Sequence, residues 1–259
     1  MENDRQKSIG FYISIFRNVK NFWTVFLYFW GKVNSGELEL HFRDGLVIKC
    51  NVEKGDVNRV ILSKLGLLYP WELLKDIPDR SVVYDLGAGI GDFSVVLGSL
   101  RKDIRIYCLE PRKDRLLLLD DNINSNKYYE RMVGIEVAIG NYNGNCSDRD
   151  NTIKQNISGT SDSVQQNRSR PLRVRRLETL IDEISIHPNV IKMDIGGAEY
   201  GVLVDSKPVL KYCHSILLMY HPSPDIGDTK EYLGYLFDSI DFDIVYSTDK
   251  IIYAKNRSR

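Results

Sequence analysis

Short apolar runs alternate with helical segments along the chain from Ser81 onward. The runs predict strands at Val82–Leu86, Ile104–Leu109, Val133–Ile139, Val190–Met193 and Ser215–Met219. Helices are expected between and after them, at Phe93–Leu100, at Arg115–Asn122, from about Ala198 and around Lys230–Ile240. Strands separated by helices of this length predict an α/β fold, a doubly wound and mostly parallel sheet with helices on both faces.

The end of the chain departs from this alternation. Phe242–Tyr246 and Ile251–Ala254 are apolar runs separated only by residues 247–250, which form a turn and leave no room for a helix. The two runs therefore predict a closing hairpin, in which one strand runs antiparallel to the rest of the sheet.

Residues 1–80 show a different pattern, and we expect them to form an N-terminal extension to a domain of residues 81–259. Alternation in Glu37–Phe42 and Leu46–Val52, on either side of an Asp44-Gly45 turn, predicts a β-hairpin. A leucine-rich helical stretch is expected around Arg59–Leu74.

An aromatic segment precedes this hairpin. One amphipathic helix is predicted by apolar residues at steps of three and four: Phe16, Val19, Trp23, Phe26 and Trp30. The apolar run Phe22–Trp30 is far shorter than the about 20 residues that cross a bilayer, and no signal-peptide cleavage site follows it. We expect the helix to pack on its own domain; peripheral membrane contact through residues 9–30 is the alternative.

A polar insertion interrupts the domain at about residues 141–170. It consists mainly of Asn, Ser, Asp, Gln and Arg, and it lacks the apolar residues that a core needs. Five arginines lie at its end: Arg168, Arg170, Arg173, Arg175 and Arg176. One hypothesis is that they line the mouth of a site for an anionic or phosphate-linked substrate; a solvated edge strand is the alternative.

Composition limits the function classes. Lys plus Arg and Asp plus Glu each number 35, so the net charge is zero and DNA is not an expected partner. The cysteines are widely spaced and form no CxxC pair, which favours the reducing cytoplasm: Cys50, Cys108, Cys146 and Cys213. We expect no metal, because His41, His187 and His214 have no partners at metal-ligand spacing.

The strongest motif runs from Val82 to Ser94, where a strand enters a glycine-rich turn that opens a helix. The glycines let the backbone turn tightly and approach a ligand without a Cβ between them, and ligands of open α/β sheets bind at the carboxyl ends of the strands. We expect this segment to bind the cofactor through Asp85, Gly87, Ala88, Gly89, Gly91 and Phe93.

A second cofactor element is Glu110, which ends the next strand and precedes Pro111. A carboxylate there can accept hydrogen bonds from both hydroxyls of a ribose. Asp92 occupies the place of the last glycine in a dinucleotide fingerprint, and Asp85 suits a cationic donor better than a pyrophosphate. These details favour S-adenosylmethionine over a nicotinamide cofactor or a glycine turn without a ligand.

A third motif lies in the segment 191–199, which contains Lys192, Asp194, Gly197, Ala198 and Glu199. With the run Asp85–Ser94 and with Glu110-Pro111, it resembles the motifs of the FkbM-type methyltransferase family. The resemblance covers most of the chain and implies a Rossmann-like class I methyltransferase domain, S-adenosylmethionine as cofactor, and methylation of a hydroxyl on a sugar, glycolipid or secondary metabolite.

Two positions depart from the family pattern. Gly196 stands where the family usually has Glu, and Met219 stands where it often has Glu, two residues before His221. If those acids serve the acceptor, these departures imply another acceptor or lost activity.

Three residues are candidates for catalysis. Asp194 ends the fourth strand and is expected to orient acceptor or donor; an N-cap is its alternative role. Glu199 could take the acceptor's proton or bind the donor's amino end, or simply be a first-turn carboxylate. His221 follows the fifth strand and could be a general base, or an ordinary surface histidine.

Two other functions stay open at this point. An RNA base methyltransferase is disfavoured, because Asp194-Ile195-Gly196 stands where such enzymes often carry Asn-Pro-Pro. A non-catalytic S-adenosylmethionine-binding domain is made plausible by Gly196 and Met219.

Overall fold

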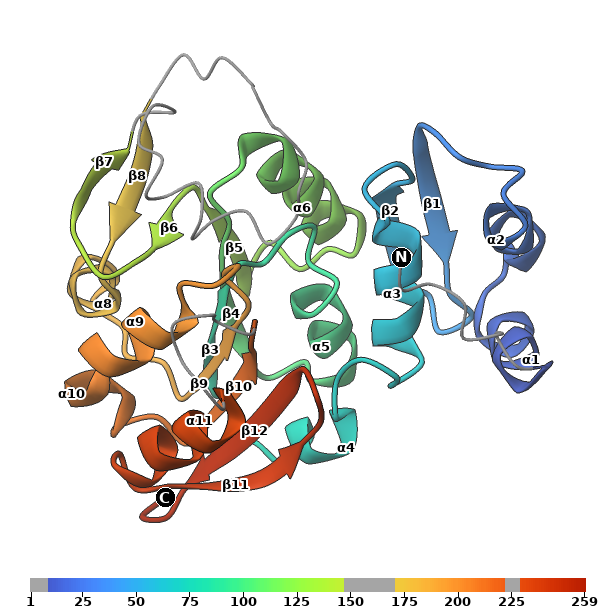
Figure 1. Cartoon of the computed structure of the whole chain (residues 1–259). Helices are drawn as coiled ribbons and strands as arrows, with labels where there is room; N and C mark the ends of the chain where they lie inside the picture. Colours follow the sequence, from blue (N-terminus) through green and yellow to red (C-terminus); the bar gives the residue numbers. More distant parts are fainter. Residues whose placement is uncertain (1–8, 147–170, 222–228) are drawn as a thin grey trace.

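The computed structural model describes residues 9–146, 171–221 and 229–259 of the 259-residue chain (Figure 1). Its centre is a seven-stranded sheet in the order β11-β12-β10-β9-β3-β4-β5. The strands are β3 (Val82–Leu86), β4 (Arg105–Leu109), β5 (Met132–Ile135), β9 (Val190–Met193), β10 (Ser215–Met219), β11 (Phe242–Ser247) and β12 (Ile251–Asn256). Only β12 runs antiparallel to its neighbours, β10 and β11. The predicted parallel sheet that ends in a hairpin is confirmed.

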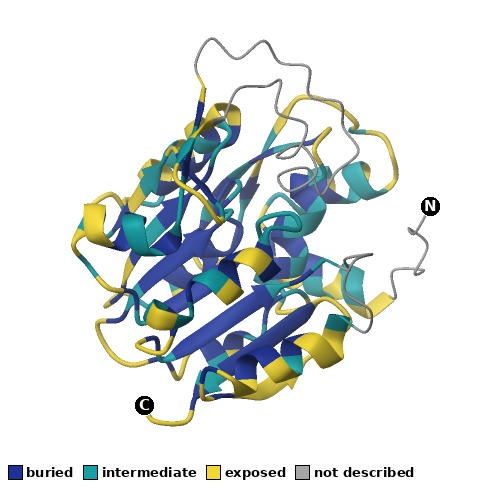
Figure 2. Cartoon of the chain, turned by 60° about the vertical axis from the view of Figure 1, so that its left-hand side comes forward, coloured by how far each residue is buried: buried dark blue, intermediate teal, exposed yellow. Residues whose placement is uncertain are grey.

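Side chains alternate between the two faces of this sheet, and each face buries its own set of helices. One face carries Val83 and Ile106 and packs against α3 (Asp56–Lys64), α4 (Trp71–Leu74), α5 (Ser94–Leu100) and α6 (Lys113–Ser125). The other carries Tyr84 and Ile191 and packs against α8 (Leu177–Ile184), α9 (Glu199–Asp205), α10 (Lys207–Leu210) and α11 (Thr229–Asp238). In Figure 2 the strands are buried along most of their length and the helices are exposed only on their outer sides.

The predicted single strand Val133–Ile139 is wrong. The chain leaves the central sheet after Ile135, and β6 (Ala138–Ile139) pairs instead with β8 (Leu172–Arg175), which also pairs with β7 (Gly144–Cys146). This second sheet stands over the carboxyl ends of the central strands (Figure 1). Most of the predicted polar insertion, residues 147–170, lies outside the described part of the chain, together with Arg168 and Arg170.

The predicted single N-terminal helix is two helices, α1 (Ile9–Asn18) and α2 (Phe22–Phe29). The break is held by the hairpin of β1 (Glu37–His41) and β2 (Val47–Asn51). Val19 forms a bridge with Phe42, and the side chain of Asn21 accepts a hydrogen bond from the His41 N–H at 3.0 Å. These contacts hold the backbone out of the helical path.

The N-terminal region packs directly on the sheet domain. Asn122 of α6 and Asn126, which caps the end of that helix, accept hydrogen bonds from the backbone N–H groups of Lys49 and Val47, at 2.7 and 3.0 Å. One continuous hydrophobic cluster runs from α1 to the sheet. A division at residue 80 remains a prediction from the sequence. Among the described helices, none is long and apolar enough to cross a membrane.

Candidate cofactor and acceptor site

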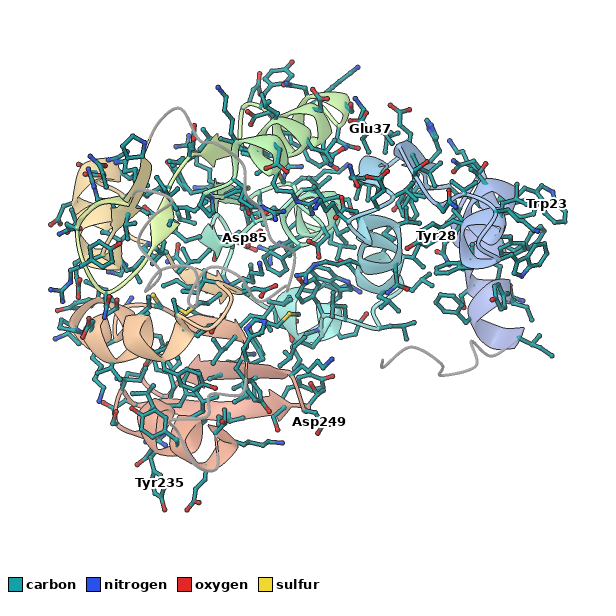
Figure 3. All side chains as sticks on the ribbon, turned by 45° about the horizontal axis from the view of Figure 1, so that its top comes forward. Trp23, Tyr28, Glu37, Asp85, Tyr235 and Asp249 are labelled. Atoms are coloured by element: carbon teal, nitrogen blue, oxygen red, sulfur yellow. The ribbon has the colours of Figure 1, made fainter. Side chains whose placement is uncertain are left out.

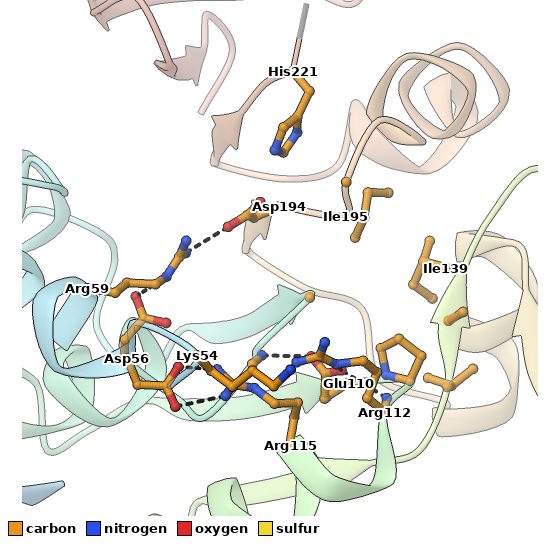
Figure 4. Close-up of a pocket in the computed structure, with 17 residues that line it drawn as sticks. Lys54, Asp56, Arg59, Glu110, Arg112, Arg115, Ile139, Asp194, Ile195 and His221 are labelled. Atoms are coloured by element: carbon orange, nitrogen blue, oxygen red, sulfur yellow. Dashed lines mark hydrogen bonds and ion pairs between the residues drawn. The ribbon is translucent and has the colours of Figure 1, made fainter. Parts of the chain in front are cut away.

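A cavity of about 310 Å³ opens at the carboxyl ends of β3, β4 and β9, next to the point where the strand order reverses (Figure 4). Open α/β sheets bind their ligands at this place, and the size is that of a small-molecule site. Charged side chains of both signs line it: Lys54, Asp56, Arg59, Asp92, Glu110, Arg112, Arg115 and Asp194.

The glycine turn after β3 forms the floor of the cavity. Gly87 has a φ of +76°, and a Cβ there would lie 1.9 Å from the carbonyl oxygen of Asp194. Gly89 also has a positive φ, +58°, but a Cβ there would meet no atom closer than 3.9 Å, because this glycine faces the cavity. Gly91 faces inward, where a Cβ would lie 2.7 Å from Leu119. Gly87 thus allows two backbone segments to cross closely, Gly89 leaves the backbone open to a ligand, and Gly91 allows α6 to pack against the turn.

Glu110 presents a buried carboxylate to the cavity. Its two oxygens accept hydrogen bonds from the N–H groups of Gly89 and Arg112, each at 2.9 Å. Burial raises the pKa of Glu110, although these hydrogen bonds and Arg112 work in the opposite direction. Each carboxylate oxygen keeps a lone pair for a further donor. Pro111 lines the cavity beside it.

Four of the expected cofactor residues do not line the cavity. Asp85 is completely buried beneath the turn, where it forms an ion pair with Lys192 at 2.8 Å and accepts a hydrogen bond from Ser94 at 2.6 Å. Ala88 and Phe93 are buried in the core, and Gly91 packs against α6. The charge of Asp85 is compensated inside the protein, and its expected contact with the donor stays a prediction from the sequence.

Arg59 is a site residue that the sequence did not reveal. It projects from α3 into the cavity, and its guanidinium donates to Asp92 at 2.9 Å, to Asp194 at 2.7 Å and to the hydroxyl of Tyr69 at 2.9 Å. It joins the two motifs that follow β3 and β9, which carry Asp92 and Asp194. The only available signal was an arginine inside a leucine-rich helix, and such residues usually face solvent.

A second residue of α3 forms an ion pair that also lines the cavity. Asp56, three residues before Arg59, receives two hydrogen bonds from the guanidinium of Arg115 on α6, at 2.8 and 2.5 Å. Residues three apart share one face of a helix, so α3 presents one acid and one base to the cavity. The N-terminal region therefore completes a site that the sequence placed entirely within residues 82–221.

The three predicted catalytic residues lie together. Glu199, which is fully buried, accepts hydrogen bonds from the N–H groups of Ile195 and Gly197 at 2.9 and 2.8 Å, and its Oε1 lies 3.1 Å from Nδ1 of His221. Each of Asp194, Glu199 and His221 offers one atom that could bind a metal ion, and these three atoms lie within 4.8 Å of one another. Asp194 and His221 line the cavity (Figure 4), whereas Glu199 is buried and does not line it.

The pKa values in this cluster shift in ways that suit proton transfer. The hydrogen bond to Glu199 raises the pKa of His221, against the effect of burial. Burial would raise the pKa of Asp194, but the charges of Arg59 and Lys192 outweigh it and lower that pKa. Asp194 is thus a carboxylate at neutral pH, and His221 is a base whose strength exceeds that of a free imidazole.

The positions that depart from the family pattern both lie at this site. Gly196 lines the cavity and has a φ of +66°, a conformation that L side chains rarely adopt. The sulfur of Met219 lies 4.0 Å from Nη1 of Arg59. The arginines expected at the mouth of the site do not line the cavity where the structure describes them. Arg173 and Arg175 pair instead with Glu183.

Comparison with solved structures gives remote matches. They include precorrin-6y C5,15-methyltransferase from Geobacter metallireducens (15% identity, 71% of this chain and 84% of that chain, TM-score 0.44) and a putative RNA methyltransferase from Pyrococcus horikoshii (12%, 76% and 84%, 0.46). TYW2 of M. jannaschii, solved with AdoMet, matches at 13% identity over 86% of this chain and 84% of that chain, with a TM-score of 0.42. No curated protein matches the sequence significantly.

The sequence itself gives a clearer answer. Residues 85–241, more than half of the chain, match the family described as methyltransferase FkbM domain. The match spans the glycine turn, Glu110, the segment 191–199 and His221, so it includes all the residues that line the cavity except Lys54, Asp56 and Arg59. The chain therefore belongs to the FkbM methyltransferase family, and its methyl donor is S-adenosylmethionine.

Proposed function

We propose that the protein is an O-methyltransferase that acts on a hydroxyl group of a sugar, glycolipid or secondary metabolite. The observation that carries this proposal is the pair formed by His221 and the buried Glu199 at the cavity, with 3.1 Å between Nδ1 and Oε1. A hydroxyl must lose its proton when it is methylated, and a histidine held by a carboxylate is a suitable base.

The cavity fits the cofactor at the positions where its parts need partners. Glu110 offers buried carboxylate oxygens to the ribose hydroxyls, and Gly89 leaves the backbone open toward the methionine portion. Apolar side chains beside Glu110 suit the adenine ring: Pro111, Val137, Ala138 and Ile139. When bound, S-adenosylmethionine supplies a methyl group that is already electrophilic, so the protein's main task is positioning.

His221 acts as the general base in this proposal. Glu199 accepts the hydrogen bond at Nδ1, so Nε2 is the nitrogen that is left to take a proton from the acceptor. Glu199 cannot rotate away, because two backbone N–H groups hold its oxygens. The carboxylate also stabilises the imidazolium that forms when the proton arrives.

Asp194 and Arg59 position the acceptor. The Arg59 guanidinium holds the Asp194 carboxylate at 2.7 Å and keeps it ionised. An ionised carboxylate beside His221 accepts a hydrogen bond from a neighbouring acceptor hydroxyl and orients it. The charges that line the cavity are balanced, four acids against four bases, so a neutral polyhydroxyl acceptor fits it as well as an anion.

Two measurements test the proposal. Calorimetry with S-adenosylhomocysteine reports donor binding, and transfer of a labelled methyl group is then screened across glycans, glycolipids, small polyols and tRNA. His221→Ala should keep donor affinity and lose transfer, while His187→Gln, an exposed histidine away from the cavity, should change neither. Transfer to a base of tRNA would show that the protein is an RNA base methyltransferase and not the proposed enzyme. Donor binding without transfer to any acceptor would favour a non-catalytic domain.

A further inference from the structure

An apolar face covers the outer side of the α1–α2 helix pair. On each helix the exposed apolar residues recur at i, i+4 and i+7, and together they form what we call the aromatic face: Ile9, Ile13, Phe16, Trp23, Leu27 and Trp30. Ile9 is 81% exposed, Trp23 62% and Trp30 58%. Soluble surfaces rarely carry so much contiguous apolar area without a partner.

The two stripes join into one surface. Phe16 contacts Phe22 across the helix pair with 4.8 Å between ring centroids, and Phe22 contacts Trp23 at 5.2 Å. Ile15 and Val25 point the other way and are fully buried. In Figure 3 Trp23 points away from the molecule and Tyr28 lies on the side toward α3, so the aromatic face is the outermost surface of this end.

The charge on the helix pair itself has one sign, although the adjoining β1 carries Glu37 and Glu39. Residues 9–36 contain three basic residues, Arg17, Lys20 and Lys32, and no acidic residue, although the whole chain is neutral. All three are exposed, and no carboxylate of the described residues forms an ion pair with them. Arg17 lies in the last turn of α1, Lys20 lies between the helices and Lys32 follows α2, so the positive charges border the apolar surface.

We propose that the aromatic face binds the surface of an anionic lipid bilayer, with α1 and α2 lying in the plane of the interface. A helix that lies in an interface buries its apolar side, places Trp at headgroup depth and keeps Lys or Arg near the lipid phosphates. The helices are too short to span a bilayer. A protein partner would need a matching acidic apolar groove, whereas an anionic bilayer offers both features over any area.

The experiment measures sedimentation of the full chain with vesicles of phosphatidylcholine, with or without phosphatidylglycerol. We expect binding to the anionic vesicles and a loss of binding as salt is raised. Arg17→Gln with Lys20→Gln should weaken it by about fivefold for each charge, or about 25-fold together. Lys102→Gln with Lys250→Gln removes two exposed charges elsewhere and should leave it unchanged.

Trp23→Ser with Trp30→Ser tests the apolar contribution. This variant should lose binding to the anionic vesicles, and Leu117→Ser with Tyr235→Ser, two exposed apolar residues elsewhere, should not. The chain has three tryptophans and Trp71 is buried, so quenching by brominated lipid should disappear in the variant. Thermal unfolding checks that each variant folds.

Three results would overturn the proposal. The first is wild-type protein that ignores anionic vesicles. The second is binding that survives both double substitutions. The third is self-association in sedimentation velocity that Trp23→Ser with Trp30→Ser abolishes, because it would assign the aromatic face to a second copy of the chain.

Discussion

Lys192 on β9 holds Asp85 on β3, with 2.8 Å between Nζ and Oδ1, and both side chains are almost completely excluded from solvent. The same ammonium donates a hydrogen bond to the carbonyl oxygen of Gly87 at 2.8 Å. Burial would lower the pKa of Lys192, but the charges of Asp85 and Asp194 outweigh it and raise that pKa. One buried cation thus links the 85–94 turn to the 191–199 segment, the two motifs that carry the family resemblance.

Lys192→Met should destabilise the fold more than an ordinary core substitution. It leaves the carboxylate of Asp85 buried without a counter-charge, which costs about 3–5 kcal/mol in the free energy of unfolding. Asp85→Asn combined with Lys192→Met removes both charges and should recover much of the loss. Urea denaturation of the wild type and both variants measures this; equal losses in the single and the double variant would contradict the role of the pair.

The fold was largely predictable because each central strand is a short apolar run with turn residues at its ends. The error at Val133–Ile139 is informative: only Glu136 interrupts the apolar residues, and the chain divides there because β6 pairs with β8. Likewise α1 and α2 are separated by a backbone bridge and a side-chain hydrogen bond to the β1–β2 hairpin, about 20 residues away. Periodicity reports local burial, and it carries no information about which distant strand competes for the backbone.

The site was predictable where a motif is local, and unpredictable where it depends on distant contacts. Glu110, Gly87 and Gly89 reach the cavity as expected from their places after the strands. Asp85 does not reach the cavity, because its charge is compensated by Lys192 inside the protein. This partner is 107 positions away in the sequence, so no local motif reveals it. Arg59 was missed for the same reason, since its carboxylate partners are 33 and 135 positions away.

The pH dependence of methyl transfer should follow His221. Its pKa is raised by the hydrogen bond to Glu199, so turnover should fall as pH falls through that raised value, above the usual 6.5. Glu199→Gln should move this acidic limb to lower pH and reduce kcat, because the base is weaker and less well oriented. A limb that does not move between wild type and Glu199→Gln, measured as kcat against pH, would exclude His221 as the base.

The same pair makes stability depend on pH with a defined sign. A histidine whose folded pKa is raised stabilises the fold fully below its unfolded pKa, and this stabilisation is lost as pH rises through the folded pKa. The difference in the free energy of unfolding between wild type and His221→Gln should therefore shrink from about pH 6 to higher pH. His187→Gln, measured in the same way, should show no such trend.

Arg59 should matter more through its shape than through its charge alone. Arg59→Met removes hydrogen bonds to Asp92, Asp194 and Tyr69, and we expect a loss of about 2–3 kcal/mol in the free energy of unfolding, as for charged hydrogen bonds that are partly exposed. Arg59→Lys keeps the charge and cannot reach all three partners. Both variants should raise KM for the acceptor or lower kcat, whereas Arg105→Met, an exposed control, should do neither.

The glycines of the turn offer a contrast between folding and ligand binding. Gly87→Ala places a Cβ 1.9 Å from the carbonyl oxygen of Asp194, so β3 and β9 must separate and the protein should unfold or aggregate. Gly89→Ala meets no atom within 3.9 Å and costs only the strain of its positive φ, about 1 kcal/mol. Its methyl group instead enters the cavity, so affinity for S-adenosylhomocysteine should fall at least tenfold while the protein stays folded.

Calorimetry and thermal unfolding on the same samples separate the two effects. Gly234→Ala, on α11 with no atom within 4 Å of the added Cβ, serves as the control and should be neutral or slightly stabilising. Unchanged donor affinity in Gly89→Ala would mean that the ligand does not approach the backbone at this turn. That result would exclude the cavity as the cofactor site. The family assignment would still stand, because it does not depend on Gly89.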